Sequence, residues 1–253
     1  MLFTDNPAIE IEDLADYETA ILDTALTEGI NLTVKIRLAI NEVGLQLQSQ
    51  FTPLGTNGFA TSPQLTLSNI VVTPPLRLWL LFHTLELVYR DAYFSQLNDR
   101  YQAKWNEYVS LSTSAAALLL QIGVGTVADP IPQAVHPGLS LVAGALAPAT
   151  YFVEVSWDNV SGQEGSPSET TALDVPSGST LQVQALSPPS NAVSWNVYAG
   201  VTPDALFLQN TTPLDPSASW TAPDSGLSTT GPQPGTGQPP TYLSPQPKIL
   251  LRG

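Results

Sequence analysis

The first half of the chain has the periodicity of amphipathic helices. Hydrophobic residues recur about every 3.6 positions between Ile11 and Ala25, and acidic residues gather in the first turns, where the helix dipole favours negative charge. Asp5 or Asn6 can cap this predicted helix, and Gly29 can end it.

The same periodicity predicts two further helices around a central one. The first begins after Asn31, whose side chain can cap it, and fades into the turn-rich stretch "SQFTPLGTNGFATSP". The last restarts at Asn98 or Asp99 and ends at Gly123. We therefore predict a bundle of about four helices over residues 1–130.

The central helix has the strongest start signal, because Thr73 can cap it and Pro74 and Pro75 suit a first turn. One broad hydrophobic ridge runs from Leu78 to Ala92, and a narrow ridge lies apart from it. A helix with two such ridges must bury both, so it is either central in its own bundle or packed between its own core and another subunit. The predicted subunit interface combines the narrow ridge with two basic residues of the polar stripes: Leu76, Leu80, Leu87, Phe94, Arg77 and Arg90.

The helical period disappears after residue 130, and Pro, Gly, Ser and Thr become frequent. Short alternating segments follow at intervals of about ten residues, which is typical of a small antiparallel β-sandwich. We predict a linker over 131–137, a sandwich over 138–230 and a Pro-rich extended tail over 231–253. The predicted fold class is α+β, with more than one domain.

One hairpin is predicted in detail from "VSWNVYAGVTPDALFLQN", Val193 to Asn210. Alternation places Trp195 on the inner face of the first strand and Tyr198 on the outer face, and residues 202–204 form the turn.

Composition narrows the choice of partners. The 253 residues include 8 basic and 22 acidic ones, a net charge of -14. Such a balance argues against electrostatic binding to nucleic acid or to an anionic membrane. There is no Cys, which excludes disulfides and thiolate chemistry. No stretch has the length and hydrophobicity of a membrane span or a secretory signal, so we expect a protein made and kept in a cytoplasm, or assembled there.

No constellation of residues indicates catalysis. His83 and His136 are the only histidines, and neither has the context of a nucleophilic triad or a zinc site. Carboxylates of the second half could be posed as a glycosidase pair, but nothing in their spacing favours that over loop solubility: Glu154, Asp158, Glu164 and Glu169. We expect a non-enzymatic protein without catalytic, cofactor-binding or metal-binding residues. One acidic cluster could in principle bind a cation, but we interpret it as the solvated start of a helix, where the dipole favours negative charge: Glu10, Glu12, Asp13 and Asp16.

Four segments of the first half carry a family resemblance: "EDLADYETAILDTAL", "TPPLRLWLLFHTLELVYRDAYF", "NDRYQAKWNEYVSL" and "IGVGTVADP". Over roughly the first 130 residues the chain resembles the helical head-to-tail adaptor (connector or neck) proteins of tailed bacteriophages. The resemblance implies a virion protein at the head-tail junction that is assembled in the host cytoplasm. It implies a homo-oligomeric ring, a dodecamer in many adaptors, that binds the portal protein and downstream neck or tail proteins. DNA would pass through the ring without specific binding.

The second half resembles the immunoglobulin-like or fibronectin type III-like modules of phage structural proteins, through "YFVEVSWDNVSGQEGSPSE" and "WNVYAGVTPDALFLQN". The alternative function is a surface-exposed binding or decoration protein, in which this domain recognises a host-surface glycan or another virion protein. Candidate sugar platforms are Trp157, Trp195, Trp220 and Tyr198, although alternation favours the core for the first two.

The end of the tail suits docking on a sheet edge or groove of another chain, and a disordered tail is the alternative. The predicted docking residues are Lys248, Ile249, Leu250, Leu251 and Arg252.

Overall fold

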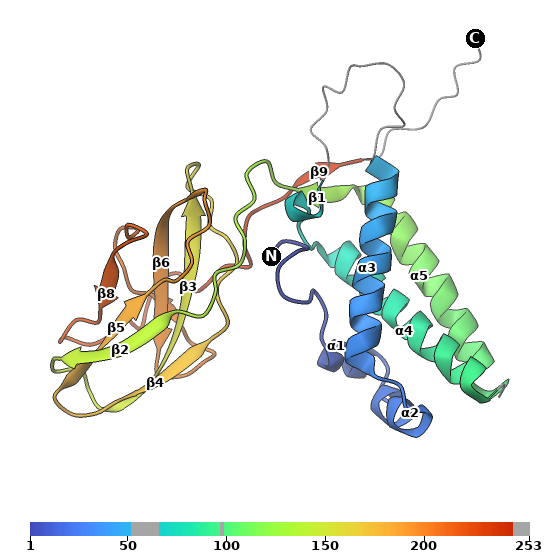
Figure 1. Ribbon diagram of the computed structural model, residues 1–253, viewed down its shortest axis with the longest axis horizontal. Helices are drawn as coiled ribbons and strands as arrows, with labels where there is room; N and C mark the ends of the chain where they lie inside the picture. The colour runs from blue at the N-terminus through green and yellow to red at the C-terminus, as the bar shows by residue number, and fades with distance from the viewer. Residues whose placement is uncertain (52–65, 97–98, 245–253) are drawn as a thin grey trace, which may run out of the picture. The chain divides into compact units, whose positions relative to one another are not determined.

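The computed structural model describes residues 1–51, 66–96 and 99–244 and divides the chain into two compact units (Figure 1). The helical unit comprises Phe3–Val127 together with the chain from Pro240 onward. The β unit comprises Met1–Leu2 and Ala128–Pro239. Helices fill the first half and antiparallel sheets the second, as the α+β prediction requires.

The helical unit contains five α-helices within the described residues, one more than predicted. They are α1 (Ile11–Tyr17), α2 (Ile21–Glu28), α3 (Leu32–Phe51), α4 (Pro74–Gln96) and α5 (Gln102–Ile122). Two short 3₁₀ turns, η1 (Leu67–Asn69) and η2 (Asp99–Tyr101), precede α4 and α5.

The extra helix arises because the first predicted helix is broken after Tyr17. Glu18 is extended, with φ -126° and ψ 92°, and its backbone carbonyl accepts the N–H of Ile21 at 2.9 Å as α2 begins. Its side chain turns inward to Lys104 and Tyr108. No Gly or Pro marks the break, and the hydrophobic period continues through it. The sequence therefore predicted one helix where the structure has two.

The start of α1 also differs from the prediction. Glu10 precedes the helix, and its backbone N–H donates to the Asp13 carboxylate at 2.8 Å. The prediction of Asp5 or Asn6 as the cap is therefore wrong, because the local acidic pair forms the helix start instead.

The other helix boundaries follow their sequence signals. Gly29 ends α2 in the left-handed conformation, with φ 66°. The side chain of Asn31 accepts a backbone N–H of the first turn of α3 at 3.1 Å. α4 begins directly after Thr73, and Gly123 ends α5 with φ 107°.

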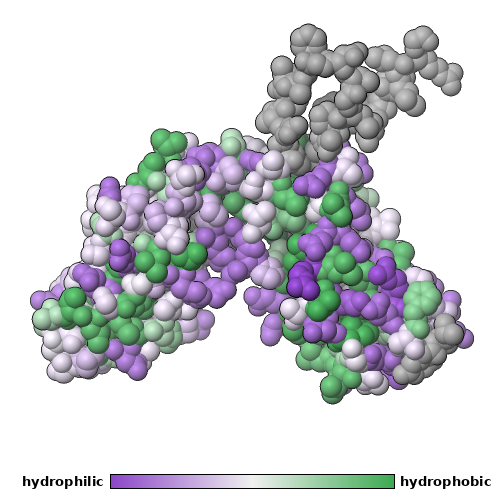
Figure 2. Space-filling view, in the orientation of Figure 1, coloured by the Kyte–Doolittle hydropathy of each residue, from purple (hydrophilic) through white to green (hydrophobic). Residues whose placement is uncertain are grey.

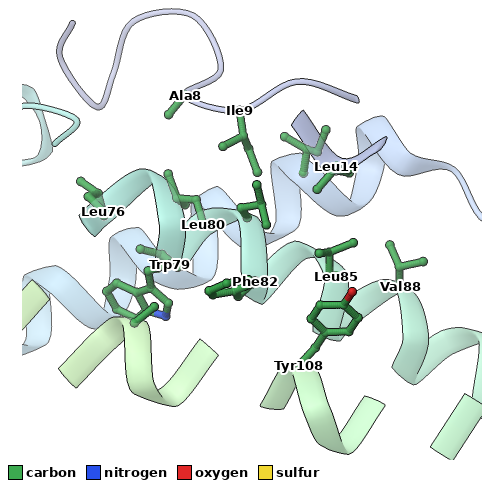
Figure 3. Close-up of a cluster of buried hydrophobic side chains, with 14 of the residues drawn as sticks. Ala8, Ile9, Leu14, Leu76, Trp79, Leu80, Phe82, Leu85, Val88 and Tyr108 are labelled. Carbon is green, nitrogen blue, oxygen red and sulfur yellow. The ribbon is translucent and has the colours of Figure 1, made fainter. Parts of the chain in front are cut away.

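α4 is the central helix of this unit and packs against α2, α3 and α5. Its side chains enter the core on more than one side: Figure 3 shows Ile9 above α4 near Leu80, and Trp79 and Phe82 on the other side of the helix. Tyr89 stacks on Tyr108 of α5, with ring centroids 5.4 Å apart. A helix that is hydrophobic around its circumference is buried on most sides.

A two-stranded antiparallel sheet closes one end of the helical unit. β1 (Val124–Thr126) pairs with β9 (Thr241–Leu243), so Gly125 faces Tyr242. A Cβ atom at Gly125 would lie 2.7 Å from Thr73 Cγ2 and 2.9 Å from Pro240 Cβ. Both distances are too short for a carbon–carbon contact, so this position requires glycine.

The predicted domain borders of the second half change accordingly. Residues 240–244 belong to the helical unit, and residues 231–239 belong to the β unit, so the described part of the predicted tail is not a free extension. Gln238 is buried, and its side chain accepts the Ile131 N–H at 2.7 Å. The predicted linker is also part of the β unit, because Ile131 and Ala134 lie in its core.

The β unit contains two antiparallel sheets. One has the order β2-β5-β8 and the other the order β4-β3-β6-β7. The strands are β2 (Gly138–Ala143), β3 (Ala149–Asn159), β4 (Thr171–Val175), β5 (Ser179–Gln184), β6 (Ala192–Gly200), β7 (Phe207–Leu208) and β8 (Ser219–Thr221).

Both sheets contribute to one hydrophobic core. Trp157 and Trp195 are directly paired across β3 and β6 and are fully buried, and Val183 of β5 belongs to the same cluster. The predicted β6–β7 hairpin is confirmed. It ends β6 at Gly200, where a Cβ atom would lie only 2.2 Å from the Ala205 carbonyl oxygen.

Candidate interaction surface

Three polar clusters are candidates for chemistry, and the first joins α5 to the break between α1 and α2. The carboxylate of Glu18 accepts hydrogen bonds from Lys104 Nζ at 2.7 Å and from Tyr108 Oη at 2.6 Å. Burial by itself raises the pKa of Glu18, but the hydrogen bonds from Lys104 and Tyr108 outweigh it and hold the pKa below its ordinary value. The cluster is an internal ion pair of the helical unit.

The second cluster surrounds His83 on α4. This side chain is buried, and it lies between Glu86, 3.0 Å from Nδ1, and Glu42 of α3, 2.8 Å from Nε2. Burial by itself lowers the pKa of His83, but both carboxylates favour the charged ring and raise the pKa overall. His83 therefore ties α3 to α4.

The third cluster covers the outer face of β3 and β6. Tyr198 is buried there and donates to Glu164 at 2.6 Å, so the prediction that it is exposed is wrong. Asp158 accepts hydrogen bonds from Asn196 at 3.1 Å and from Ser194 at 3.2 Å. Burial, and then the charge of Glu164, raise the pKa of Asp158. Residues 164–168 pair with the edge of β3, and the Glu164 side chain reaches Tyr198 across this face. Alternation therefore places Tyr198 on the correct face but does not reveal that it is buried.

No group of three or more His, Cys, Asp or Glu residues that could hold a metal ion occurs in the described part of the chain. In the acidic cluster at α1, Asp13 pairs with Arg77 at 2.6 Å. None of the described helices is long and apolar enough to cross a membrane.

The predicted subunit interface is divided by the structure. Leu76, Leu80 and Leu87 are completely buried within the helical unit, so the prediction that this ridge faces a neighbour is corrected for them. The covering side chains come from a distant part of the sequence, including Ile9 (Figure 3). Phe94 is different, because 57% of its surface is exposed.

The remaining predicted residues have mixed positions. Arg77 is exposed and paired with Asp13, and Arg90 is half-buried near Glu86. The tail-docking residues lie outside the described part of the chain: Lys248, Ile249, Leu250, Leu251 and Arg252.

A hydrophobic surface that the sequence analysis missed lies at the end of the helical unit that contains α2 (Figure 2). We call it the α2 surface, and it consists of Leu22, Leu26, Ile30, Val34 and Phe94. Leu26 is 84% exposed and Leu22 51% exposed. A groove of about 460 Å³ runs between α2 and the start of α3, and it shares the residues Gly29 to Asn31 with a second hollow of about 520 Å³ beside Phe94.

A signal for the α2 surface exists in the sequence. Leu22 and Leu26 are four residues apart and therefore lie on the same face of a helix, outside the ridge formed by Ile21 and Ala25. Exposed hydrophobic neighbours of this kind mark interaction sites more often than isolated ones do.

The proposed sugar platforms are not available on the surface. Trp157, Trp195, Trp220 and Tyr198 are all buried. Among the described residues, the exposed aromatic side chains are Tyr17, Phe94 and Tyr242, and all three belong to the helical unit.

No protein-family model and no curated protein sequence matches this chain.

Proposed function

We propose that this protein is a structural virion protein, a head-to-tail adaptor that forms an oligomeric ring between the portal and the tail of a bacteriophage and continues the DNA channel. The observation that carries the proposal is the α2 surface. Leu26 and Phe94 present hydrophobic area to solvent beside the groove between α2 and the start of α3. Such an area is stabilised by contact with another protein chain.

The charge of the chain supports the same function. A net charge of -14 offers few cations to replace the counterions of DNA phosphates. A ring of such subunits would let DNA slide through its channel without being retained.

The β unit fits the role of an appended immunoglobulin-like or fibronectin type III-like sandwich. Its two antiparallel sheets and shared core, with Trp157 against Trp195, support that architecture. In this proposal the sandwich decorates the outside of the neck. The glycan-binding alternative is less well supported, because the four aromatic candidates are buried.

The purified protein, alone and mixed with its portal protein, tests the proposal. We expect rings in negative-stain images and masses of multiple subunits in mass photometry. The rings can form in the protein alone or only after the portal protein is added. A protein that stays monomeric in both samples and leaves the portal unbound would contradict the adaptor function.

A further inference from the structure

We propose that the α2 surface of one subunit binds the C-terminal segment of a neighbouring copy, around Lys248–Arg252. This inference rests on the proposed ring, because it names the contact that joins one subunit to the next. Four observations carry it: the shape of the acceptor, its charge, the chemistry of the segment and the distance between them.

The acceptor is a hydrophobic groove rather than an isolated exposed side chain. Leu22 and Leu26 line one wall, and Leu32 at the start of α3 lines the other. Phe94 continues the surface, and its ring is held in place by edge contacts with Tyr93 and Trp105, at centroid distances of 5.1 and 5.6 Å. A hydrophobic groove of this kind suits the side chains of a short hydrophobic segment.

The charged residues that α2 brings to the groove are acidic. α2 carries Asp23 and Glu28 and has no basic residue. Lys35 lines the hollow beside Phe94, but it is paired with Asp91. The groove therefore favours a hydrophobic segment that carries positive charge.

The C-terminal segment has this chemistry. After Lys104 the sequence contains only two basic residues, Lys248 and Arg252, and they enclose three hydrophobic ones in "KILLR". The rest of the second half contains acidic residues but no Lys or Arg. No other segment there therefore offers the positive charge that the groove favours.

Distance excludes the groove of the same chain. β9 lies beside Thr73 at the start of α4, whereas Glu28 of α2 accepts a hydrogen bond from Ser95 at 2.9 Å, near the end of α4 (Figure 1). α4 rises about 1.5 Å per residue, so roughly 22 residues separate these ends by about 33 Å. The eight residues from 245 to Arg252 span at most about 29 Å when fully extended. The donor must therefore come from another copy.

This contact has a consequence for assembly. The donor segment follows β9, and β9 and the groove lie at opposite ends of the helical unit (Figure 1). Each subunit can therefore bind one neighbour with its tail and another with its groove. A head-to-tail contact of this type forms a ring when the rotation between subunits closes.

A labelled peptide of residues 244–253 tests the contact directly. The acceptor is the full chain with the double substitution L250D/L251D, which removes competition from its own tails. We expect saturable binding in fluorescence anisotropy, and a loss of affinity of about tenfold or more when Leu26→Glu is added, because one leucine contact is lost.

The matched control is Leu45→Glu on α3, where the leucine is also exposed, at 67%, but lies outside the α2 surface. This control should leave the peptide affinity unchanged, and a peptide of scrambled order should bind more weakly. Absence of binding at millimolar peptide, or equal losses for Leu26→Glu and Leu45→Glu, would overturn the inference.

A mixture of two full-length variants tests the contact between copies. Leu26→Glu keeps a donor tail and L250D/L251D keeps an acceptor groove, so native mass spectrometry should detect a one-to-one pair that grows no further. Failure to form this pair would contradict the contact. If the pair forms but the wild-type protein never binds the portal, the adaptor function fails and the contact stands. If Leu26→Glu forms portal-bound rings as well as wild type, the contact fails and the adaptor function stands.

Discussion

At the scale of single residues, two buried ionisable groups connect the helices of one unit. Glu18 joins the break between α1 and α2 to α5, and His83 joins α4 to α3. Their pKa values move in opposite directions, so the stability that Glu18 contributes is lost as pH falls and the stability that His83 contributes is lost as pH rises. Each effect can be measured separately.

Glu18→Gln is expected to destabilise the helical unit by about 1–3 kcal/mol at neutral pH, because two hydrogen bonds to a charged group are weakened. The folded pKa of Glu18 lies below its unfolded value, so the wild-type contribution is present above the unfolded pKa and is lost as pH falls through the folded pKa. Urea unfolding followed by circular dichroism at several acidic pH values measures this. Glu12→Gln, at an exposed position in α1, is the control. Identical pH dependence in Glu18→Gln and wild type would contradict the assignment.

His83→Gln is expected to lower the free energy of unfolding by about 1–2 kcal/mol below the ordinary pKa of histidine, because two charge-assisted hydrogen bonds are lost. The folded pKa of His83 is raised, so the wild-type contribution is present below the unfolded pKa and disappears as pH rises through the folded pKa. The same unfolding series, extended to alkaline pH, should show the two proteins converging. His136→Gln, at an exposed site, is the control.

At the scale of elements, α4 decides whether the helical unit folds. Leu80 is completely buried, so Leu80→Glu places a charge in the core and should cost more than about 4 kcal/mol, enough to remove the helical signal in circular dichroism. Leu26→Glu, in the same unit but exposed, should retain that signal. A Leu80→Glu protein that keeps its helices would show that the narrow ridge faces outward after all.

At the scale of the whole molecule, the chain has two separate hydrophobic cores. Trp195→Ala is expected to destabilise the β unit by about 3–5 kcal/mol, because a fully buried tryptophan leaves a cavity. Differential scanning calorimetry should then show one transition moved to lower temperature, while the helical signal melts as in wild type. A single shifted transition for both signals would indicate that the units unfold together.

Local signals in the sequence determined much of this molecule. Gly29, Asn31 and Gly123 mark helix boundaries because capping and left-handed turns depend on adjacent residues alone. Alternation likewise identified β3 and β6, and it placed Trp195 in the core. The absence of Cys excludes thiol chemistry.

Tertiary structure decided which surfaces remain exposed. The narrow ridge of α4 is covered by Ile9, and Tyr198 is covered by the loop that carries Glu164, through contacts between residues far apart in the sequence. The break at Glu18 depends on Lys104 and Tyr108, which lie more than 80 residues away. Periodicity reports that a face is hydrophobic, but only the folded chain determines what covers it. For that reason Leu26, rather than Leu80, is left available for a partner.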